Sequence, residues 1–234
     1  MNILVDSPSF FAKVCSASYI NFKSFQKILD VFELDGYCLF LDHKNVSALI
    51  INDDKSAVIC FRGSDDLEDW KYNSNLISKA DNYFKGRIHK GFMLSLQLIW
   101  DELIYNLEQF YNHKSLYFCG HSAGGAIASL AFARLYNDYN VKRLYTFGSP
   151  RIGDKEFVDD FEERFKGETH HFTNGKDIIP FVPFRYYPFH NLQFLGENRL
   201  DISIENILSI DLTNLPYLRD HNIDSYVEAL CAIY

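Results

Sequence analysis

A serine between two glycines, at the junction of a predicted strand and a predicted helix, constrains the fold of this chain more than any other feature. Residues 115–119 form a short apolar run typical of a buried strand, and residues 123–136 have the composition of a helix. The tight turn between them requires small residues, and Gly120 and Gly124 meet that need because they lack a β-carbon. This pattern predicts a nucleophile elbow, in which the hydroxyl of Ser122 projects beside the N-terminus of a helix.

Length, composition and charge limit the classes of protein that this chain can belong to. With 234 residues, 47% of them hydrophobic, the chain can bury one large core, so we expect a single domain over residues 1–234. No apolar stretch is long enough to cross a membrane. The net charge of −8 argues against nucleic acid as a partner. Because the first residues lack a basic region followed by a long apolar block, the default expectation is a cytoplasmic location.

Metal and disulfide sites are not expected from the cysteines and histidines. The cysteines are odd in number and widely spaced, which argues against a disulfide framework or a zinc site. His170 and His171 are neighbours on a predicted strand and therefore point to opposite faces, so they cannot bind one metal ion together. We expect neither a metal nor a cofactor. The five cysteines are Cys15, Cys38, Cys60, Cys119 and Cys231.

Strands and helices alternate along most of the chain, and no repeat or linker divides it. This alternation predicts an α/β sheet with helices on both faces. Apolar, β-branched runs predict strands at residues 37–41, 46–51, 57–61, 115–119, 143–147 and 169–173, and helical periodicity predicts helices at 9–32, within 88–111, and at 123–136, 154–165 and 221–233.

A nucleophilic serine needs a base, and the base needs an acid that orients it. Where a serine lies on such an elbow, the acid and then the histidine follow it in the chain. The acid that fits best is Asp177, which comes just after the predicted strand at 169–173, where ligand sites of open α/β sheets collect. Asp154, Asp159 and Asp160 also follow the elbow and remain alternatives.

The base is expected to be His221, which immediately precedes the last predicted helix. His190 is the other histidine downstream of Asp177, but its aromatic surroundings are more typical of a packing or pocket-wall residue. His89 lies upstream and is interpreted as a hydrogen-bonded core histidine.

Two backbone or side-chain donors are needed to stabilise the oxyanion that forms on the substrate. One is expected to be the backbone N–H of Ala123, the residue after the nucleophile. The other is expected from Ser64, which follows the strand at 57–61 and the glycine Gly63. Each such donor contributes roughly 3–4 kcal/mol of transition-state stabilisation.

Six ordered sequence blocks resemble those of the class 3 lipase family, the fungal-type triacylglycerol lipases and their plant and bacterial relatives. They extend from about Phe61 to Tyr226, which is most of the chain. The blocks are Phe61–Ser64 with Trp70, Arg87–Phe92, Gly120–Gly125, Tyr145–Gly153, Asp177–Pro183, and Asp220–His221 with Tyr226.

The resemblance implies an α/β-hydrolase fold with a central, mostly parallel mixed sheet. It implies hydrolysis of acylglycerol or other lipid esters through an acyl-enzyme, without a cofactor and with transient contact to a lipid interface. Ser122, Asp177 and His221 match the family's catalytic triad, and Ser64 and Ala123 match its oxyanion hole.

The resemblance also places a lid at about residues 65–80. This segment is rich in Asp, Glu, Lys and Asn, whereas lids of the family present an apolar face to an oil–water interface. The choice between lipase and esterase therefore stays open at this point. Two further readings also remain: a thioesterase or acyltransferase, and a catalytically inactive lipid-binding protein on a hydrolase scaffold.

Overall fold

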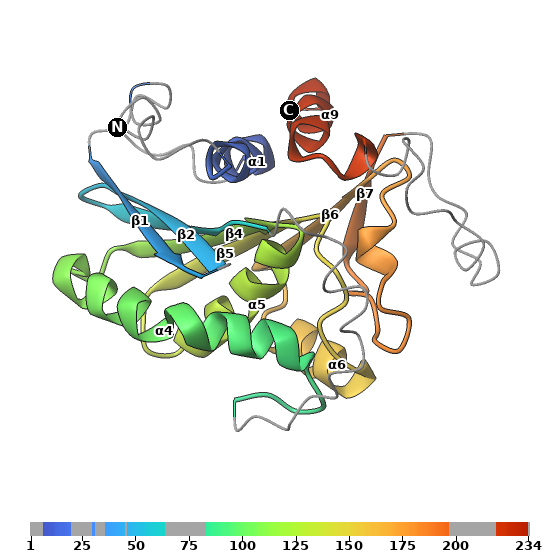
Figure 1. The fold of residues 1–234 in the computed structure, drawn as a ribbon, viewed down its shortest axis with the longest axis horizontal. Coiled ribbons are helices and arrows are strands. Elements are labelled where there is room, and N and C mark those ends of the chain that lie inside the picture. The colour runs from blue at the N-terminus through green and yellow to red at the C-terminus, as the bar shows by residue number, and fades with distance from the viewer. Residues whose placement is uncertain are drawn as a thin grey trace.

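The computed structural model describes residues 7–19, 30, 36–44, 46–63, 83–196 and 219–233. Ser64 and the lid-like segment at 65–80 lie outside these residues. The elements in chain order are α1 (Pro8–Ala17), β1 (Tyr37–His43), β2 (Val46–Asn52), β3 (Ser56–Phe61), α4 (Lys90–Phe110), β4 (Ser115–His121), α5 (Ala123–Leu135), β5 (Val141–Phe147), α6 (Lys155–Arg164), β6 (Thr169–Asn174), η3 (Ile179–Phe181, a 3₁₀ turn), β7 (Leu192–Leu195) and α9 (Ile223–Ile233) (Figure 1).

A seven-stranded mixed sheet forms the centre of the molecule, and its strands lie side by side in chain order. β1, β2 and β3 pair antiparallel, and β3 to β7 pair parallel. A connection between two parallel strands is right-handed, and each connection from β3 to β6 leads to the next strand in the same direction across the sheet. The helices in these connections, α4, α5 and α6, therefore lie on one face of the sheet. α1 and α9 cover the other face (Figure 1). The predicted sheet, mostly parallel and flanked on both faces, is confirmed.

The face under α4, α5 and α6 is closed by an apolar core. α4 buries one side at helical spacing, including Phe92, Ile99 and Leu103. The strands contribute every second residue, such as Ile50 and Ile59, since alternate side chains of a strand point to the same face. Hydrophobic burial on this face therefore follows directly from the sequence pattern.

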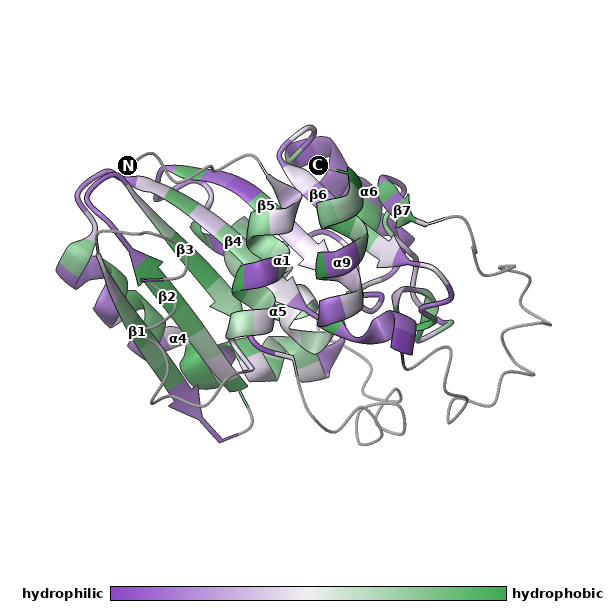
Figure 2. Cartoon of the chain, turned by 90° about the horizontal axis from the view of Figure 1, so that it is seen from above, coloured by the Kyte–Doolittle hydropathy of each residue, from purple (hydrophilic) through white to green (hydrophobic). Residues whose placement is uncertain are grey.

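The face under α1 and α9 uses the other half of each strand, including Ile51 and Val58. α1 and α9 pack against each other as well as on the sheet, and Figure 2 shows them lying side by side across it. Phe11 of α1 stacks on Tyr145 of β5 with ring centroids 4.1 Å apart. Tyr226 of α9 is fully buried in the same core.

Two elements differ from the sequence-based expectation. β7 falls inside the aromatic stretch from 181 to 195, for which no strand was expected, because three half-buried residues followed by one buried residue give no clear alternation. α1 ends at Ala17, so a single helix over residues 9–32 is wrong at this point of the chain. Among the described residues, no helix has the length and apolar character needed to cross a membrane.

Candidate active site

The turn between β4 and α5 holds Ser122 in an unusual backbone conformation. Its φ and ψ are 55° and −133°, a region that non-glycine residues rarely occupy and that stores strain. Close packing fixes this conformation: the Ser122 N–H donates to the Phe147 carbonyl at 2.9 Å. A β-carbon at Gly124 would lie 2.1 Å from the Phe61 carbonyl oxygen, and one at Gly120 would lie 2.3 Å from that of Gly124. Both glycines are therefore required by the turn.

The structure brings Ser122, His221 and Asp177 together from three distant parts of the sequence. The serine hydroxyl lies 3.0 Å from Nε2 of His221, and Nδ1 of the same ring lies 2.8 Å from Oδ2 of Asp177. The exposed fractions of these residues are 1%, 5% and 0%. Because one ring nitrogen faces each partner, the imidazole can take a proton from the hydroxyl while its other N–H donates to the carboxylate.

The Asp177 carboxylate receives donors on both oxygens. Oδ2 accepts from the phenolic hydroxyl of Tyr226 at 2.5 Å as well as from His221, and Oδ1 accepts from the Ile179 N–H at 2.8 Å. Burial and the negative charge of Asp177 raise the pKa of Tyr226 well above its usual range, so the phenol keeps its proton and donates. A buried carboxylate that is satisfied in this way is held in one orientation toward His221.

His121, the residue before Ser122, hydrogen-bonds to the backbone of His221. Its Nε2 lies 2.7 Å from the backbone oxygen of His221, and its Nδ1 lies 2.8 Å from the hydroxyl of Tyr19. Burial, followed by the nearby His221, lowers the pKa of His121 well below its usual value, so this ring is neutral. Since a carbonyl only accepts, Nε2 carries the proton and Nδ1 accepts from Tyr19.

Gly63, in the turn after β3, also packs closely against Ser122. A β-carbon at Gly63 would lie 3.0 Å from the β-carbon of Ser122 and 2.8 Å from the His121 carbonyl oxygen. Ala123 is the first residue of α5, where backbone N–H groups of the helix are unpaired within the helix. The end of the described segment after β3 and the start of α5 therefore both lie beside Ser122, and Ser64 itself lies outside the described residues.

The rival acids lie elsewhere and have other partners. Asp154 caps α6 by accepting from the Phe157 N–H at 3.0 Å. Asp160 pairs with Lys85 at 2.9 Å. Asp159 lies on the surface, where it forms an ion pair with Lys155 and a hydrogen bond with His190.

The remaining histidines are also away from the serine. His190 is 54% exposed and faces Asp159 at 3.1 Å, so its interpretation as a packing or pocket-wall residue is wrong. His89 is buried at the start of α4, where Nδ1 accepts from the Gly91 N–H, and burial lowers its pKa to about 4. His171 is buried with Nδ1 at 2.7 Å from the Thr146 hydroxyl.

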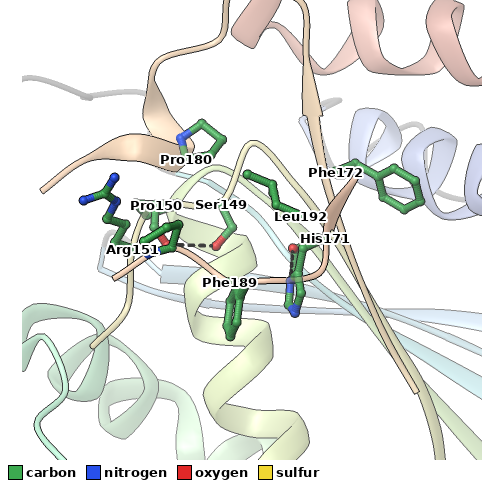
Figure 3. A pocket seen from close by; sticks show the side chains of 10 residues that line it. Ser149, Pro150, Arg151, His171, Phe172, Pro180, Phe189 and Leu192 are labelled. Carbon is green, nitrogen blue, oxygen red and sulfur yellow. Dashed lines mark hydrogen bonds between the residues drawn. The ribbon is translucent and has the colours of Figure 1, made fainter. Parts of the chain in front are cut away.

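A small cavity lies beside the candidate site, behind the turn that follows β5 (Figure 3). His171 and Phe189 form one wall, with their rings stacked at a centroid distance of 3.8 Å. Ser149 and Arg151 lie on the opposite side of the cavity in Figure 3. None of the side chains of Ser122, His221 and Asp177 lines this cavity.

The aromatic residues between 181 and 189 differ in burial. Phe181, Tyr186 and Phe189 are core residues, whereas Phe184 and Tyr187 are exposed.

Comparison with known families fits this geometry. A model of the family described as lipase (class 3) matches residues 58–187, which is more than half of the chain. The chain belongs to the class 3 lipase family. The resemblance inferred from the six blocks is thereby confirmed.

Curated relatives include fungal and bacterial proteins. A secreted mono- and diacylglycerol lipase of Fusarium solani is 31% identical over 55% of this chain and 40% of its own length. The lipase of Rhizomucor miehei is 32% identical over 56% of this chain and 38% of its own length. The toxin TseL of Vibrio cholerae is 37% identical over 41% of this chain and 15% of its own length. The chain therefore spans about two fifths or less of these relatives.

Solved structures of fungal lipases share the fold. A fungal lipase–inhibitor complex superposes with a TM-score of 0.70 at 20% identity, and the match covers 92% of this chain and 91% of that one. The Rhizomucor miehei lipase–propeptide complex gives a TM-score of 0.67 at 22% identity, over 82% of this chain and 66% of that one. At this identity the likeness concerns the fold, and it confirms the α/β-hydrolase class.

The expected cytoplasmic location is contradicted by the relatives. The relatives from Fusarium solani and Malassezia restricta are named as secreted lipases, which points outside the cell. The expectation rested on the residue pattern at the start of the given sequence and on the absence of a long apolar stretch. Neither observation determines the compartment in which a folded chain works.

Three residues that support the site were not singled out for that role by the sequence. Tyr226 was noted only as part of a sequence block, His121 only as a neighbour of the serine, and Tyr19 not at all. A tyrosine within one helical turn or so of a histidine is a common pattern on a helix. Its bond to Asp177, 49 positions away, becomes visible only when α9 is docked on the sheet.

Proposed function

We propose that this chain is a serine hydrolase that cleaves carboxylic esters of acylglycerols or similar lipids through an acyl-enzyme intermediate. The observation that carries the proposal is the continuous line of hydrogen bonds from Ser122 through His221 to Asp177 on a strained strand-to-helix turn. Membership of the class 3 lipase family supports the reaction class. Relatives named as mono- and diacylglycerol lipases support the substrate class.

In the acylation step, Oγ of Ser122 attacks the ester carbonyl carbon while Nε2 of His221 takes the hydroxyl proton. The imidazolium that forms is stabilised by Asp177, which accepts from Nδ1. The negative charge on the former carbonyl oxygen is bound by the Ala123 N–H and by Ser64. Collapse of the tetrahedral intermediate breaks the ester bond, and His221 gives its proton to the departing alcohol.

In the deacylation step, the same groups act on water. Nε2 of His221 takes a proton from a water molecule, which attacks the acyl carbon bound to Ser122. The second tetrahedral intermediate again places its charge at the oxyanion donors. Its collapse releases the carboxylic acid, and the proton returns from His221 to the serine oxygen. Since both steps need an unprotonated Nε2, the rate is expected to fall at acidic pH.

Covalent labelling tests the nucleophile. A fluorophosphonate or an alkyl phosphonate ester should modify Ser122 once per chain, with peptide mass spectrometry locating the adduct. Ser122→Ala should lose the label and lower kcat by roughly 10⁶-fold, while circular dichroism shows an intact fold. Ser129→Ala is the matched control, because that serine is buried about two turns further along α5 and bonds to the Gly125 carbonyl. Labelling that persists in Ser122→Ala would overturn the proposal.

A panel of esters with graded acyl length tests the substrate class. We propose that residues 65–80 act as a lid over a lipid-binding groove, as the family resemblance implies. A jump in rate when the substrate passes its micelle concentration would support that role. Smooth saturation with short soluble esters would assign the chain to the esterases instead.

A further inference from the structure

Three cysteines that are far apart in the sequence meet between α1 and the sheet. Cys15 comes from α1, and Cys60 and Cys119 are register partners on the neighbouring strands β3 and β4. The sulfur atoms of Cys15 and Cys60 are 3.7 Å apart, and all three sulfurs lie within 4.8 Å of one another. Each residue is 0% exposed and carries a free thiol. The wide spacing in the sequence gave no sign of this cluster.

The spacing of the three sulfurs suits a single central ion. An atom bonded to three sulfurs at about 2.3 Å holds those sulfurs roughly 3.3 to 4 Å apart, from a pyramidal to a planar arrangement. The 3.7 Å between Cys15 and Cys60 falls in this range, and all three sulfurs lie within 4.8 Å of one another, so small side-chain adjustments would complete the coordination. Because two of the three residues sit on paired strands, the framework that carries the sulfurs is rigid. Sulfur is a ligand for soft, thiophilic ions.

The surroundings of the three cysteines favour a bound ion whose charge is balanced by the three thiolates. The core around the three residues is largely apolar, with Phe11, Val58 and Phe147 among its members, and the buried Ser18 hydroxyl is a polar group beside Cys60. A site in such a core is stable only when ion and ligands together are close to neutral. Three thiolates around a divalent ion leave one negative charge, and around a monovalent ion they leave two. Three thiolates around a trivalent ion leave none.

The number of ligands points in the same direction. Structural zinc sites have four protein ligands. Within the part of the chain that the structure describes, no fourth cysteine, histidine, aspartate or glutamate completes the group. A trivalent group 15 element, by contrast, forms three bonds and keeps a lone pair in the fourth direction.

We propose that Cys15, Cys60 and Cys119 form a binding site for a trivalent thiophilic metalloid of the arsenic(III) class. Arsenous acid, As(OH)₃, reacts with three thiols. Three As–O bonds break, three As–S bonds form, and each hydroxide leaves with one thiol proton as water. Arsenic stays trivalent and no oxidant or reductant is needed. The product is a neutral tris-thiolate in a dry apolar pocket.

Occupation of this site would affect the candidate active site through short connections. Cys119 lies three positions before Ser122 on the same strand and turn, and Cys60 lies three positions before Gly63. Tyr19 follows α1, and its hydroxyl bonds to His121. Drawing the three sulfurs, now within 4.8 Å of one another, onto one atom would displace side chains at the contact between α1 and the strands. We therefore expect binding to lower hydrolysis, a consequence that rests on the proposed function.

Native mass spectrometry of the full chain with sodium arsenite tests the site directly. After equilibration of the reduced protein, the expected product is one arsenic per chain, with a mass gain of one arsenic atom less three hydrogens. A product that keeps a hydroxyl group would have used only two thiols and would overturn the proposal. An unchanged mass would overturn it as well.

Cysteine variants show which thiols bind. Cys38→Ala and Cys231→Ala remove the two cysteines outside the cluster and should bind arsenic as the parent chain does. Cys15→Ala should bind at least tenfold more weakly and without loss of three hydrogens. Circular dichroism checks that Cys15→Ala is folded, and the parent mass result stands independently of it. Equal binding by Cys15→Ala would contradict the assignment.

Ester turnover at increasing arsenic occupancy is a separate readout. A rate that falls in proportion to the bound fraction supports the connection through Tyr19, and an unchanged rate at full occupancy overturns that connection. If the chain shows no ester turnover without arsenic, the proposed function fails, while the mass measurement still decides the metalloid site.

Discussion

The two faces of the sheet are built from the same strands but hold different chemistry. Under α4, α5 and α6, a large apolar core packs against the sheet, and the long helix α4 contributes one regular stripe. Under α1 and α9, the apolar core adjoins a polar group: His121 and Asp177 hydrogen-bond to His221, and Tyr226 donates to Asp177. The first face stabilises the sheet. The second face also positions the reacting groups, so changes on the two faces should have different effects.

Among the changes that compare the two faces, the largest effect is expected from Asp177→Asn, on the face of α1 and α9. The amide carries no charge to stabilise the imidazolium, and an NH2 group facing Nδ1 of His221 would hold the imidazole in the wrong tautomer. We expect kcat to fall by about 10⁴-fold with the fold retained. Steady-state ester hydrolysis and circular dichroism measure the two quantities. Asp160→Asn is the control on the other face, since it breaks an ion pair with Lys85 and should leave kcat unchanged. Equal losses in both variants would remove the distinction between the faces.

On the face of α4, Leu103→Ala should lower the free energy of unfolding by about 2–5 kcal/mol. Leu103 is 0% exposed, so truncation leaves a cavity in the core. Urea unfolding measures the loss, and kcat per folded molecule should stay within about twofold at low temperature. Leu98→Ala on the same helix is the control, because Leu98 is 41% exposed and should change stability little. A large loss of kcat in Leu103→Ala would contradict the division of roles.

A smaller effect is expected from Tyr226→Phe, which removes one donor to the Asp177 carboxylate. A hydrogen bond to a charged group contributes about 1.5–3 kcal/mol, so kcat should fall by about 10- to 100-fold. Steady-state kinetics measure kcat, and urea unfolding measures the stability of the variant. Tyr105→Phe, at a 63% exposed position, should change neither quantity. A stability loss without any kinetic change would mean that Tyr226 only packs.

The smallest effect concerns acid stability and His89, at the start of α4. Burial, followed by Arg185, lowers its pKa in the folded state from 6.5 to about 4. As the pH falls from 6.5 to 4, the unfolded chain binds a proton that the folded chain does not, so folding stability decreases. His89→Asn should flatten this decrease by up to about 1.4 kcal/mol per pH unit. Urea unfolding between pH 7 and 4 measures the slope. His113→Asn, at an exposed position, is expected to leave it unchanged, and identical slopes in all three proteins would refute the assignment.

The sequence was most informative where local pattern and tertiary role coincide. Ser122 could be selected because its turn needs glycines on both sides, which is a local steric demand. Asp177 and His221 could be selected because chain order and strand ends restrict the choice. β7 could not be predicted, since its four residues pair with β6 in a register that no local alternation reveals.

What the sequence determined by itself was the class of fold, the elbow and three side chains of one reaction type, because these depend on short-range periodicity and on the sizes of neighbouring residues. The tertiary structure decided which residues support them. Tyr19, His121 and Tyr226 reach their partners only because α1 and α9 pack on the same face, and the sulfurs of three distant cysteines meet there for the same reason. Such contacts depend on how helices dock on a sheet, and sequence spacing does not encode that docking in a readable form.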